Sequence, residues 1–289
     1  MELSHIATRE GRLSTILREE MKLSAGLMNK LKWNDRILVN GKPQHTDYQV
    51  KVSDTVTVLM DESKPQYPAE DGALDIIYED DYILAVDKKP QMLIHPSRSR
   101  DTGTLANLVI GYYQKKGLPS AFHPVTRLDR DTFGIVLLAK NAYAHALLQA
   151  TQLQKTYHAL TFGGPEEDSG IIDAPIQRLP LPSLLRQVHP DGKPSQTQYT
   201  VLQWDKICKL ALAPITGRTH QLRVHCAYMG FPILGDPQYG SDASKAFSES
   251  LGLNYQQLCA KRLEFIHPIT GEEMSLESKM DVRATMSLS

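Results

Sequence analysis

Apolar positions in the first sixty residues are spaced as in two short helices followed by strands. Between residues 12 and 21 the apolar side chains lie three or four positions apart, the period of an amphipathic helix. A second helix is predicted over residues 24–32, with the Ser24 hydroxyl as its N-cap. Of two strand patterns that follow, one ends in Asn40-Gly41, a strong hairpin signal, and the other covers residues 55–60. The pattern predicts a small α+β module.

The pattern changes after residue 62. Residues 63–72 contain two prolines and a glycine and few apolar side chains, which predicts a linker. Residues 73–289 are rich in strand patterns, including a continuous apolar run at 134–139 that indicates a buried strand. Long helices do not alternate regularly with strands, so a parallel doubly wound sheet is disfavoured. The predicted fold is α+β, with a mixed, mainly antiparallel sheet flanked by helices. Individual elements are expected as helices at 104–113 and 141–148, strands at 76–78, 82–86, 196–204 and 206–213, and a closing hairpin at 263–276.

Composition narrows the class of protein. The chain has 289 residues, of which 41% are hydrophobic and 22% charged, an ordinary globular balance that excludes a disordered chain. No apolar run reaches the roughly 18 residues of a membrane span, and the N-terminal residues lack the pattern of a signal peptide. Three widely separated cysteines form neither a disulfide framework nor a zinc motif, which is typical of the reducing cytoplasm.

Charged side chains crowd the segment that leads into the apolar run. Arg127, Asp129, Arg130 and Asp131 lie within five residues, just before that strand. A carboxylate at the mouth of a buried strand, close to guanidinium groups, is suited to act as a nucleophile or a general base. The same composition is also typical of a surface loop held by salt bridges. Judged on this segment alone, the surface loop is the favoured interpretation.

A second polar segment covers residues 216–225. Gly217 is predicted to open a helix that ends near Gly230, and its free N–H groups, together with Arg218 and Thr219, would bind an anion. Arg223 would then lie one turn below Thr219 on the same face. The five-residue spacing of the two histidines in this segment, His220 and His225, does not align zinc ligands on a helix.

Two further segments carry polar groups with ordinary structural explanations. Lys155 and Tyr157 are expected on one side of a strand, and residues 235–240 are typical of a tight loop. The sequence lacks GxxxxGK[ST], GxGxxG, HExxH and GxSxG motifs. Nucleotide-driven, nicotinamide, zincin and α/β-hydrolase chemistries therefore lose their usual support.

Taken together, these segments resemble the RluA/RluD-type family of RNA pseudouridine synthases. The resemblance extends in one order along the chain, through residues 78–81, 89–96, 103–105, 127–134, 155–157, 192–199, 216–225, 232–240 and 267–272. The N-terminal module similarly resembles the S4-like RNA-binding domain often found ahead of this catalytic domain. The resemblance implies an S4-like domain at residues 1–62, a linker at 63–72 and a pseudouridine synthase domain at 73–289.

The resemblance also implies a reaction and its residues. The family converts uridine in RNA to pseudouridine without a metal or cofactor. Asp129 corresponds to the essential carboxylate, Arg223 to the arginine that pairs with it, and Tyr157 to the tyrosine that stacks on uracil. The remaining positions expected to contact substrate are Arg127, Arg218, Thr219, His220, Gln221 and Leu222. Ribosomal RNA is expected as the substrate more than transfer RNA, with a monomeric protein acting in the cytoplasm.

Two departures from the family pattern leave alternatives open. Thr126 stands where the family usually has histidine and Phe133 where it usually has serine, so both are interpreted as changes around the pocket. These changes are the only support for a non-catalytic RNA-binding protein with a decayed synthase domain. A glycosidase or phosphate-handling hydrolase using Asp129 and Asp131 is a further alternative, because glycoside hydrolysis requires two carboxyl groups.

Charge is nearly balanced, with 32 Lys+Arg against 33 Asp+Glu and a net charge of −1. Nucleic-acid-binding proteins usually show a basic excess. The first sixty residues hold nine basic and seven acidic residues, +2, which leaves −3 for the rest of the chain. Individually placed arginines are therefore expected to bind RNA, namely Arg98, Arg100, Arg127, Arg218 and Arg223.

Overall fold

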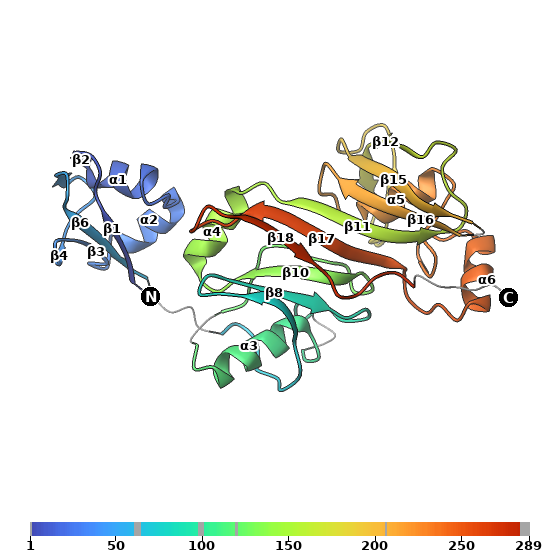
Figure 1. Ribbon diagram of the computed structural model, residues 1–289, viewed down its shortest axis with the longest axis horizontal. Coiled ribbons are helices and arrows are strands. Elements are labelled where there is room, and N and C mark those ends of the chain that lie inside the picture. The colour runs from blue at the N-terminus through green and yellow to red at the C-terminus, as the bar shows by residue number, and fades with distance from the viewer. Residues whose placement is uncertain (1, 61–64, 98–100, 119–120, 206, 284–289) are drawn as a thin grey trace.

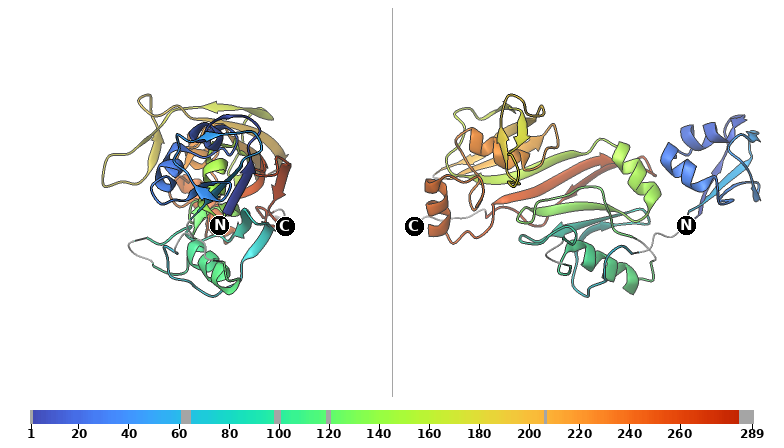
Figure 2. Two further views of the ribbon diagram at one scale, coloured as in Figure 1. Left: turned by 90° about the vertical axis from the view of Figure 1, so that its left-hand side faces the viewer. Right: turned by 180° about the vertical axis from the view of Figure 1, so that it is seen from behind.

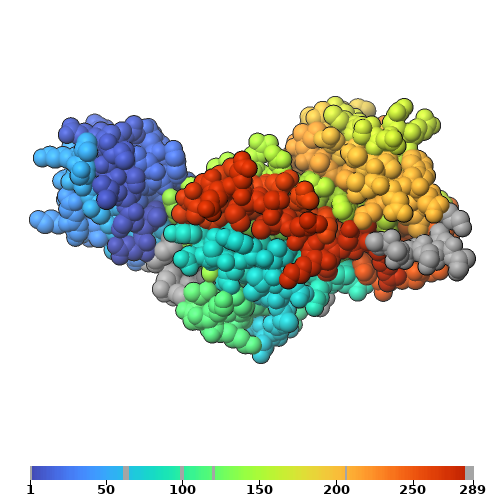
Figure 3. All heavy atoms as spheres, viewed as in Figure 1, coloured from blue at the N-terminus to red at the C-terminus, as the bar shows by residue number. Residues whose placement is uncertain are grey.

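The computed structural model describes residues 2–60, 65–97, 101–118, 121–205 and 207–283. The chain forms an N-terminal module and a larger body arranged along one long axis (Figure 1). The space-filling view shows the module as a lobe of its own (Figure 3). Arg98 and Arg100, expected to bind RNA, lie outside the described residues.

The N-terminal module is a four-stranded antiparallel sheet covered by two helices. The sheet has the order β1-β6-β3-β4, and a two-stranded ribbon pairs β2 with β5. The predicted helices form, and the Ser24 hydroxyl accepts a hydrogen bond from the N–H of Leu27 as a cap. The Asn40-Gly41 turn has positive φ at both residues, as the hairpin signal requires. The elements are β1 (Glu2–Ile6), β2 (Gly11–Arg12), α1 (Leu13–Glu19), α2 (Ala25–Leu31), β3 (Ile37–Val39), β4 (Lys42–Pro43), β5 (Gln49–Val50) and β6 (Thr55–Leu59).

The larger body is built on a ten-stranded mixed sheet. Its main path is β12-β15-β16-β11-β17-β10-β8-β7, with β18 paired to β17 and β9 to β10. Strand β10 runs parallel to β17, and the other pairs of neighbouring strands in this sheet are antiparallel. The predicted mixed, mainly antiparallel sheet is confirmed. The strands are β7 (Asp75–Glu79), β8 (Ile83–Lys88), β9 (His123–Pro124), β10 (Phe133–Ala139), β11 (Gln154–Thr161), β12 (Ser169–Asp173), β15 (Gln196–Trp204), β16 (Cys208–Pro214), β17 (Leu258–Ile266) and β18 (Glu273–Glu277).

Helices cover both faces of the sheet. Alternate residues of β8 and β10 point to opposite sides, so one set packs under α3 (Leu105–Lys115) and the other under α4 (Ala142–Ala150). At the other end lie α5 (Gln221–Tyr228), α6 (Asp242–Ser250) and a hairpin of β13 (Ile176–Arg178) and β14 (Arg186–Val188). Figure 2 shows α6 at the end of the molecule opposite the N-terminal module.

The described part of the expected linker makes more packing and hydrogen-bond contacts with the larger body than its sequence suggested. The ring of Tyr67 packs edge-on against Phe122, with 6.3 Å between centroids. The side-chain amide of Asn107 on α3 donates to the carbonyl of Pro68, and the N–H of Glu70 donates back to the carbonyl of Asn107. Residues 65–72 therefore lie along α3 as part of the larger body.

The N-terminal module contacts the larger body at α4. Tyr143 is buried within the core of the module, and its hydroxyl donates to the carbonyl of Met21 over 2.8 Å. Leu147 on the same helix and Ile269, in the turn between β17 and β18, pack against the same core. A shared apolar core thus joins the two parts.

Candidate active site

The segment that carries Asp129 is a loop between β9 and β10, secured at its start by Thr126. The Thr126 side chain is buried, and its hydroxyl accepts the N–H of Leu137 at 2.9 Å. The N–H of Thr126 donates to the carbonyl of Leu137. The Thr126 hydroxyl and backbone N–H therefore bind the start of the loop to β10.

The end of the loop requires glycine. Gly134 has φ +103°, and a Cβ there would lie 2.4 Å from the backbone oxygen of Ala260 on β17. This close approach lets β10 and β17 pair where the loop enters the sheet. Phe133 is buried in the core and packs edge-on against the Tyr255 ring, 5.9 Å between centroids. The Phe133 side chain is therefore part of the core beside the loop.

Asp129 and Arg223, which are 94 residues apart, meet directly. Nη1 of Arg223 donates to Oδ2 of Asp129 over 3.0 Å. The Asp129 side chain is 32% exposed and that of Arg223 is 5% exposed. Among the described residues, Oδ1 of Asp129 accepts no hydrogen bond, so one carboxylate oxygen is held and the other is left to react.

Arg223 is itself held by a second carboxylate. Nε and Nη2 donate to the two oxygens of Asp236, each over 2.8 Å, and Nη2 also donates to Oε1 of Gln238. The guanidinium lies 4.9 Å from the ring centroid of Tyr239. Burial opposes the charge on Arg223, but the hydrogen bonds and charges of Asp236 and Asp129 outweigh burial and raise its pKa. The cation is therefore fixed in position before substrate arrives.

The tight turn at residues 235–240 positions that second carboxylate. Gly235 has φ +72°, and a Cβ there would lie 2.1 Å from the carbonyl oxygen of Tyr255. Oδ1 of Asp236 also accepts the N–H groups of Gln238 and Tyr239. The sequence predicted only a tight loop here, so the role of Asp236 was missed. The available signal was an aspartate in a glycine-flanked turn within the family resemblance.

His220 lies on the other side of Asp129, with Nε2 3.9 Å from Oδ2. The Tyr239 hydroxyl accepts the N–H of Arg186 and lies 2.8 Å from Nδ1 of His220. The phenol's own hydrogen can then be donated to Nδ1, and in that tautomer the imidazole hydrogen lies on Nε2, the nitrogen that faces Asp129. Burial lowers the pKa of His220, with Arg223 and Arg186 adding to the effect and Asp129 opposing it. The lowered pKa favours the neutral ring beside the carboxylate.

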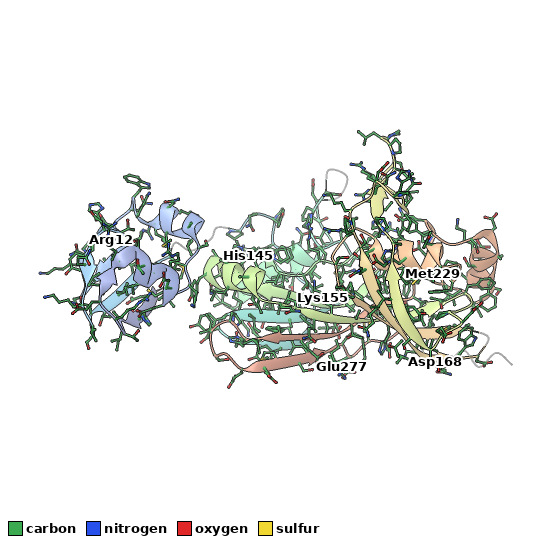
Figure 4. All side chains as sticks on the ribbon, turned by 90° about the horizontal axis from the view of Figure 1, so that it is seen from above. Arg12, His145, Lys155, Asp168, Met229 and Glu277 are labelled. Carbon is green, nitrogen blue, oxygen red and sulfur yellow. The ribbon has the colours of Figure 1, made fainter. Side chains whose placement is uncertain are left out.

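Tyr157 extends from β11, where the pairing with β17 shifts register between Thr156 and Tyr157. Its half-buried ring packs against the apolar cluster that includes Leu222. Burial, with smaller contributions from the charges of Asp129 and Cys259, raises the pKa of the phenol. The top view places β11, marked by Lys155, near the middle of the molecule (Figure 4).

Lys88 at the end of β8 is completely buried behind the loop. Its ammonium donates to the carbonyls of Lys89, Met92 and Arg130 over 2.8–3.0 Å. Burial lowers the pKa of Lys88 to about 7, against the opposing charges of Asp131 and Asp129. The bond to Arg130 ties the residue next to Asp129 into the core. Sequence reasoning gave Lys88 no role, since a lysine in a strand pattern is usually at the surface.

The residues predicted to contact substrate divide into exposed and buried groups. Arg127, Arg218 and Thr219 are exposed, and Nε of Arg218 donates to the carbonyl of Pro194. Leu222 is buried in the cluster under Tyr157. Gln221 is buried, and its amide donates to Gln196 and Thr197 and accepts from Thr216 and Arg218, so it binds the neighbouring loop; its contact with substrate stays a prediction.

The helix of this segment begins later than predicted. Helix α5 begins at Gln221, and His220 precedes it with φ 57° in the left-handed region. The predicted helical start at Gly217 is wrong, because the Gln221 side chain holds residues 216–218 in a loop. Thr219 therefore lies outside the helix, and the predicted anion site and its alignment with Arg223 do not form.

The alternative chemistries find little support in the geometry. Asp131 is bound by Nε and Nη2 of Arg130 on its own loop, whereas Asp129 faces Arg223. His225 is buried between the hydroxyl of Thr197 and the carbonyl of Ala174, in a structural role. The described residues contain no group of three or more His, Cys, Asp or Glu side chains arranged to hold a metal. No helix in the described ranges is both long and apolar enough to cross a membrane.

Comparisons with known proteins agree with this arrangement. The family model described as RNA pseudouridylate synthase matches residues 82–228, about half of the chain. The chain is 36% identical to the uncharacterized RNA pseudouridine synthase YjbO of Bacillus subtilis (strain 168), over 90% of this chain and 93% of that protein. It is 34% identical to ribosomal large subunit pseudouridine synthase D of Escherichia coli (strain K12), over 83% and 78% respectively. The solved structure of human RNA pseudouridylate synthase domain containing 1 matches with a TM-score of 0.60 and 26% identity, over 73% of this chain and 86% of that one.

Proposed function

The chain belongs to the RluA/RluD-type family of RNA pseudouridine synthases, and from this premise we propose that it isomerises uridines of ribosomal RNA with Asp129 as the essential carboxylate. The observation that carries the assignment is the pair formed by Asp129 and the buried Arg223. Family membership makes the chain an isomerase that acts on RNA, and the decayed-synthase alternative is not favoured.

The reaction breaks one bond to the sugar and makes another. The bond from ribose C1′ to uracil N1 breaks, the base turns, and uracil C5 bonds to C1′ and loses its proton. Asp129 either attacks C1′ or removes a sugar proton to give a glycal. Both routes use a free carboxylate oxygen, which Oδ1 supplies while Arg223 holds Oδ2. Neither route changes the oxidation state of the substrate overall.

Two further side chains are proposed to hold and deprotonate the base. The Tyr157 ring provides a platform on which uracil stacks, worth about 1–3 kcal/mol per base. Its hydroxyl is proposed to assist in removing the proton from C5. Nε2 of His220 faces Asp129 and is proposed to carry the imidazole hydrogen and to donate a hydrogen bond to the substrate. Arg127 is exposed beside Asp129 and is proposed to hold a flanking phosphate or fill the space left by the extruded uridine.

The proposed organisation follows the two parts of the chain. Residues 1–62 are proposed to be an S4-like RNA-binding domain and residues 73–289 the catalytic domain, with residues 63–72 as a linker whose described part packs along α3. The match to a ribosomal large subunit pseudouridine synthase supports ribosomal RNA as the substrate. We further propose that the protein is a monomer and acts in the cytoplasm.

Mapping pseudouridine in cellular RNA tests this function. Ribosomal and transfer RNA from a strain lacking the gene are compared with RNA from strains that express the parent chain, Asp129→Asn or Asp131→Asn. Positions in ribosomal RNA should be lost in the deletion and restored by the parent and by Asp131→Asn, whose carboxylate pairs within its own loop. Restoration by Asp129→Asn would refute the catalytic assignment, and loss confined to transfer RNA would refute the substrate.

A further inference from the structure

An exposed tryptophan follows helix α2 of the N-terminal module. Trp33 is 78% exposed, although an indole normally buries most of its surface. The ammonium of Lys32 lies over the ring, 4.9 Å from its centroid. This cation covers one side of the indole and leaves a large part of the ring open to solvent.

The basic charge of the module is concentrated in the stretch of sequence that contains this residue. Residues 21–42 hold Lys22, Lys30, Lys32, Arg36 and Lys42 against Asp35 as the one acid, which gives +4. The rest of the first sixty residues therefore carries −2, since the whole segment carries +2. The modest net charge of the module conceals a strongly basic stretch with Trp33 in its middle.

Ion pairs increase the difference in charge between residues 21–42 and the rest of the module. Glu19 binds Arg9 and Arg18, and Glu20 binds His5 and Arg9, so these acids are compensated within the module. By contrast, the four lysines of the basic stretch make no ion pair with any described residue. Positive charge around an exposed ring is therefore left for a partner.

We propose that Trp33 is a stacking platform for an unpaired RNA base, with the neighbouring lysines, Lys30 and Lys32 foremost, binding the adjacent phosphates. This inference rests on the proposed function and adds to it a contact far along the chain from Asp129. Every base presents a π face to an aromatic ring, and a cationic surround tracks the backbone, so such a site is tolerant of sequence. The site supplies affinity and leaves the chemistry to the larger body.

The chain contains two tryptophans, which makes the test direct. In the full-length Trp204→Phe variant, Trp33 is the sole indole, and single-stranded RNA should quench its fluorescence in a saturable titration. In Trp33→Phe, where Trp204 reports, the same RNA should change the signal little. Trp204 is the matched control because it is also exposed, at 50%, but lies at the end of β15 in the larger body.

Binding and turnover separate this inference from the proposed function. Trp33→Ala should raise the Kd for a ribosomal RNA fragment about 5- to 150-fold, the range for loss of one stacked base, and Trp204→Ala should leave it unchanged. An unchanged Kd in Trp33→Ala, or quenching of Trp33 by anionic lipid vesicles but not by RNA, would overturn the stacking site. Tritium release from C5-labelled uridine in a short single-stranded RNA should be the same for Trp33→Ala and the parent. If the parent itself releases no tritium, the proposed function fails while the Kd and quenching still decide the role of Trp33.

Discussion

Replacing Asp236 by asparagine should slow the reaction although Asp236 lies behind Arg223 and does not touch Asp129. Asp236 accepts hydrogen bonds from Nε and Nη2 of Arg223 and from the N–H groups of Gln238 and Tyr239. An asparagine has one acceptor oxygen, which the backbone N–H groups and Nη2 occupy. Its amide nitrogen then faces Nε of Arg223, donor against donor, and the guanidinium must shift.

The expected magnitudes follow from burial. The side chains of Asp236 and Arg223 are 1% and 5% exposed, and breaking such a buried pair costs about 3–5 kcal/mol. Arg223 keeps Asp129 as a partner, so about 3 kcal/mol of unfolding free energy should be lost. A misplacement of the reacting group by about 1 Å lowers the rate on the order of 100-fold. We therefore expect kcat to fall about 100-fold with little change in KM.

Tritium-release kinetics and urea unfolding measure both quantities on one protein sample. Glu79→Gln is the matched control. Glu79 lies on β7, the edge strand of the sheet, and its carboxylate accepts hydrogen bonds from Tyr112, Lys116 and Lys140. It should lose stability with kcat unchanged. A folded Asp236→Asn protein with kcat within twofold of the parent would refute the positioning argument, and an equal kcat loss in Glu79→Gln would assign the effect to general destabilisation.

Three further predictions follow from the site and its surroundings. Tyr157→Phe keeps the stacking ring and removes the hydroxyl, so RNA affinity should persist while kcat falls about 100-fold or more; undiminished kcat would exclude a proton-transfer role. Lys88→Met leaves three backbone carbonyls without their donor and should lower the unfolding free energy by about 3 kcal/mol in urea titrations, whereas parental stability would contradict this role. Burial, with the neighbouring His145, lowers the pKa of His123 to about 4 from its usual 6.5, so the folded chain binds fewer protons than the unfolded chain between those values. Stability should therefore fall as pH drops from 6.5 to 4, and less steeply in His123→Phe; identical slopes would argue against His123 as the source.

Capping and turn residues in the sequence correctly predicted those helices and hairpins whose ends are fixed by residues close by in the chain. The Ser24 side chain caps α2 as expected, and Asn141, the first residue of the helix expected at 141–148, caps α4; each accepts the N–H three residues ahead. The hairpin after β3 also forms, because Asn and Gly tolerate the positive φ of its turn. Strand β1 and helix α6 were not predicted. The mostly polar, half-exposed Glu2–Ile6 becomes a strand by pairing with β6, a partner about fifty residues away.

The sequence pointed to single residues of the site but not to the contacts between them. Asp129 and Arg223 stand out in charged motifs, but neither spacing nor composition shows that they meet across 94 residues. The helix start was misplaced because the Gln221 side chain, together with the left-handed His220, keeps residues 216–218 in a loop. Asp236 and Lys88 were missed because their roles arise from burial against distant backbone and side chains.

The most direct test of the central claim is tritium release by the purified full-length chain. Ribosomal RNA transcripts labelled at uridine C5 are incubated with the parent and with Asp129→Asn, and RNA affinity is measured in parallel. The parent should release tritium in proportion to the pseudouridine formed, while Asp129→Asn should bind RNA with the parental Kd and release none. Release by Asp129→Asn at the parental rate, or binding by the parent without release, would contradict the account.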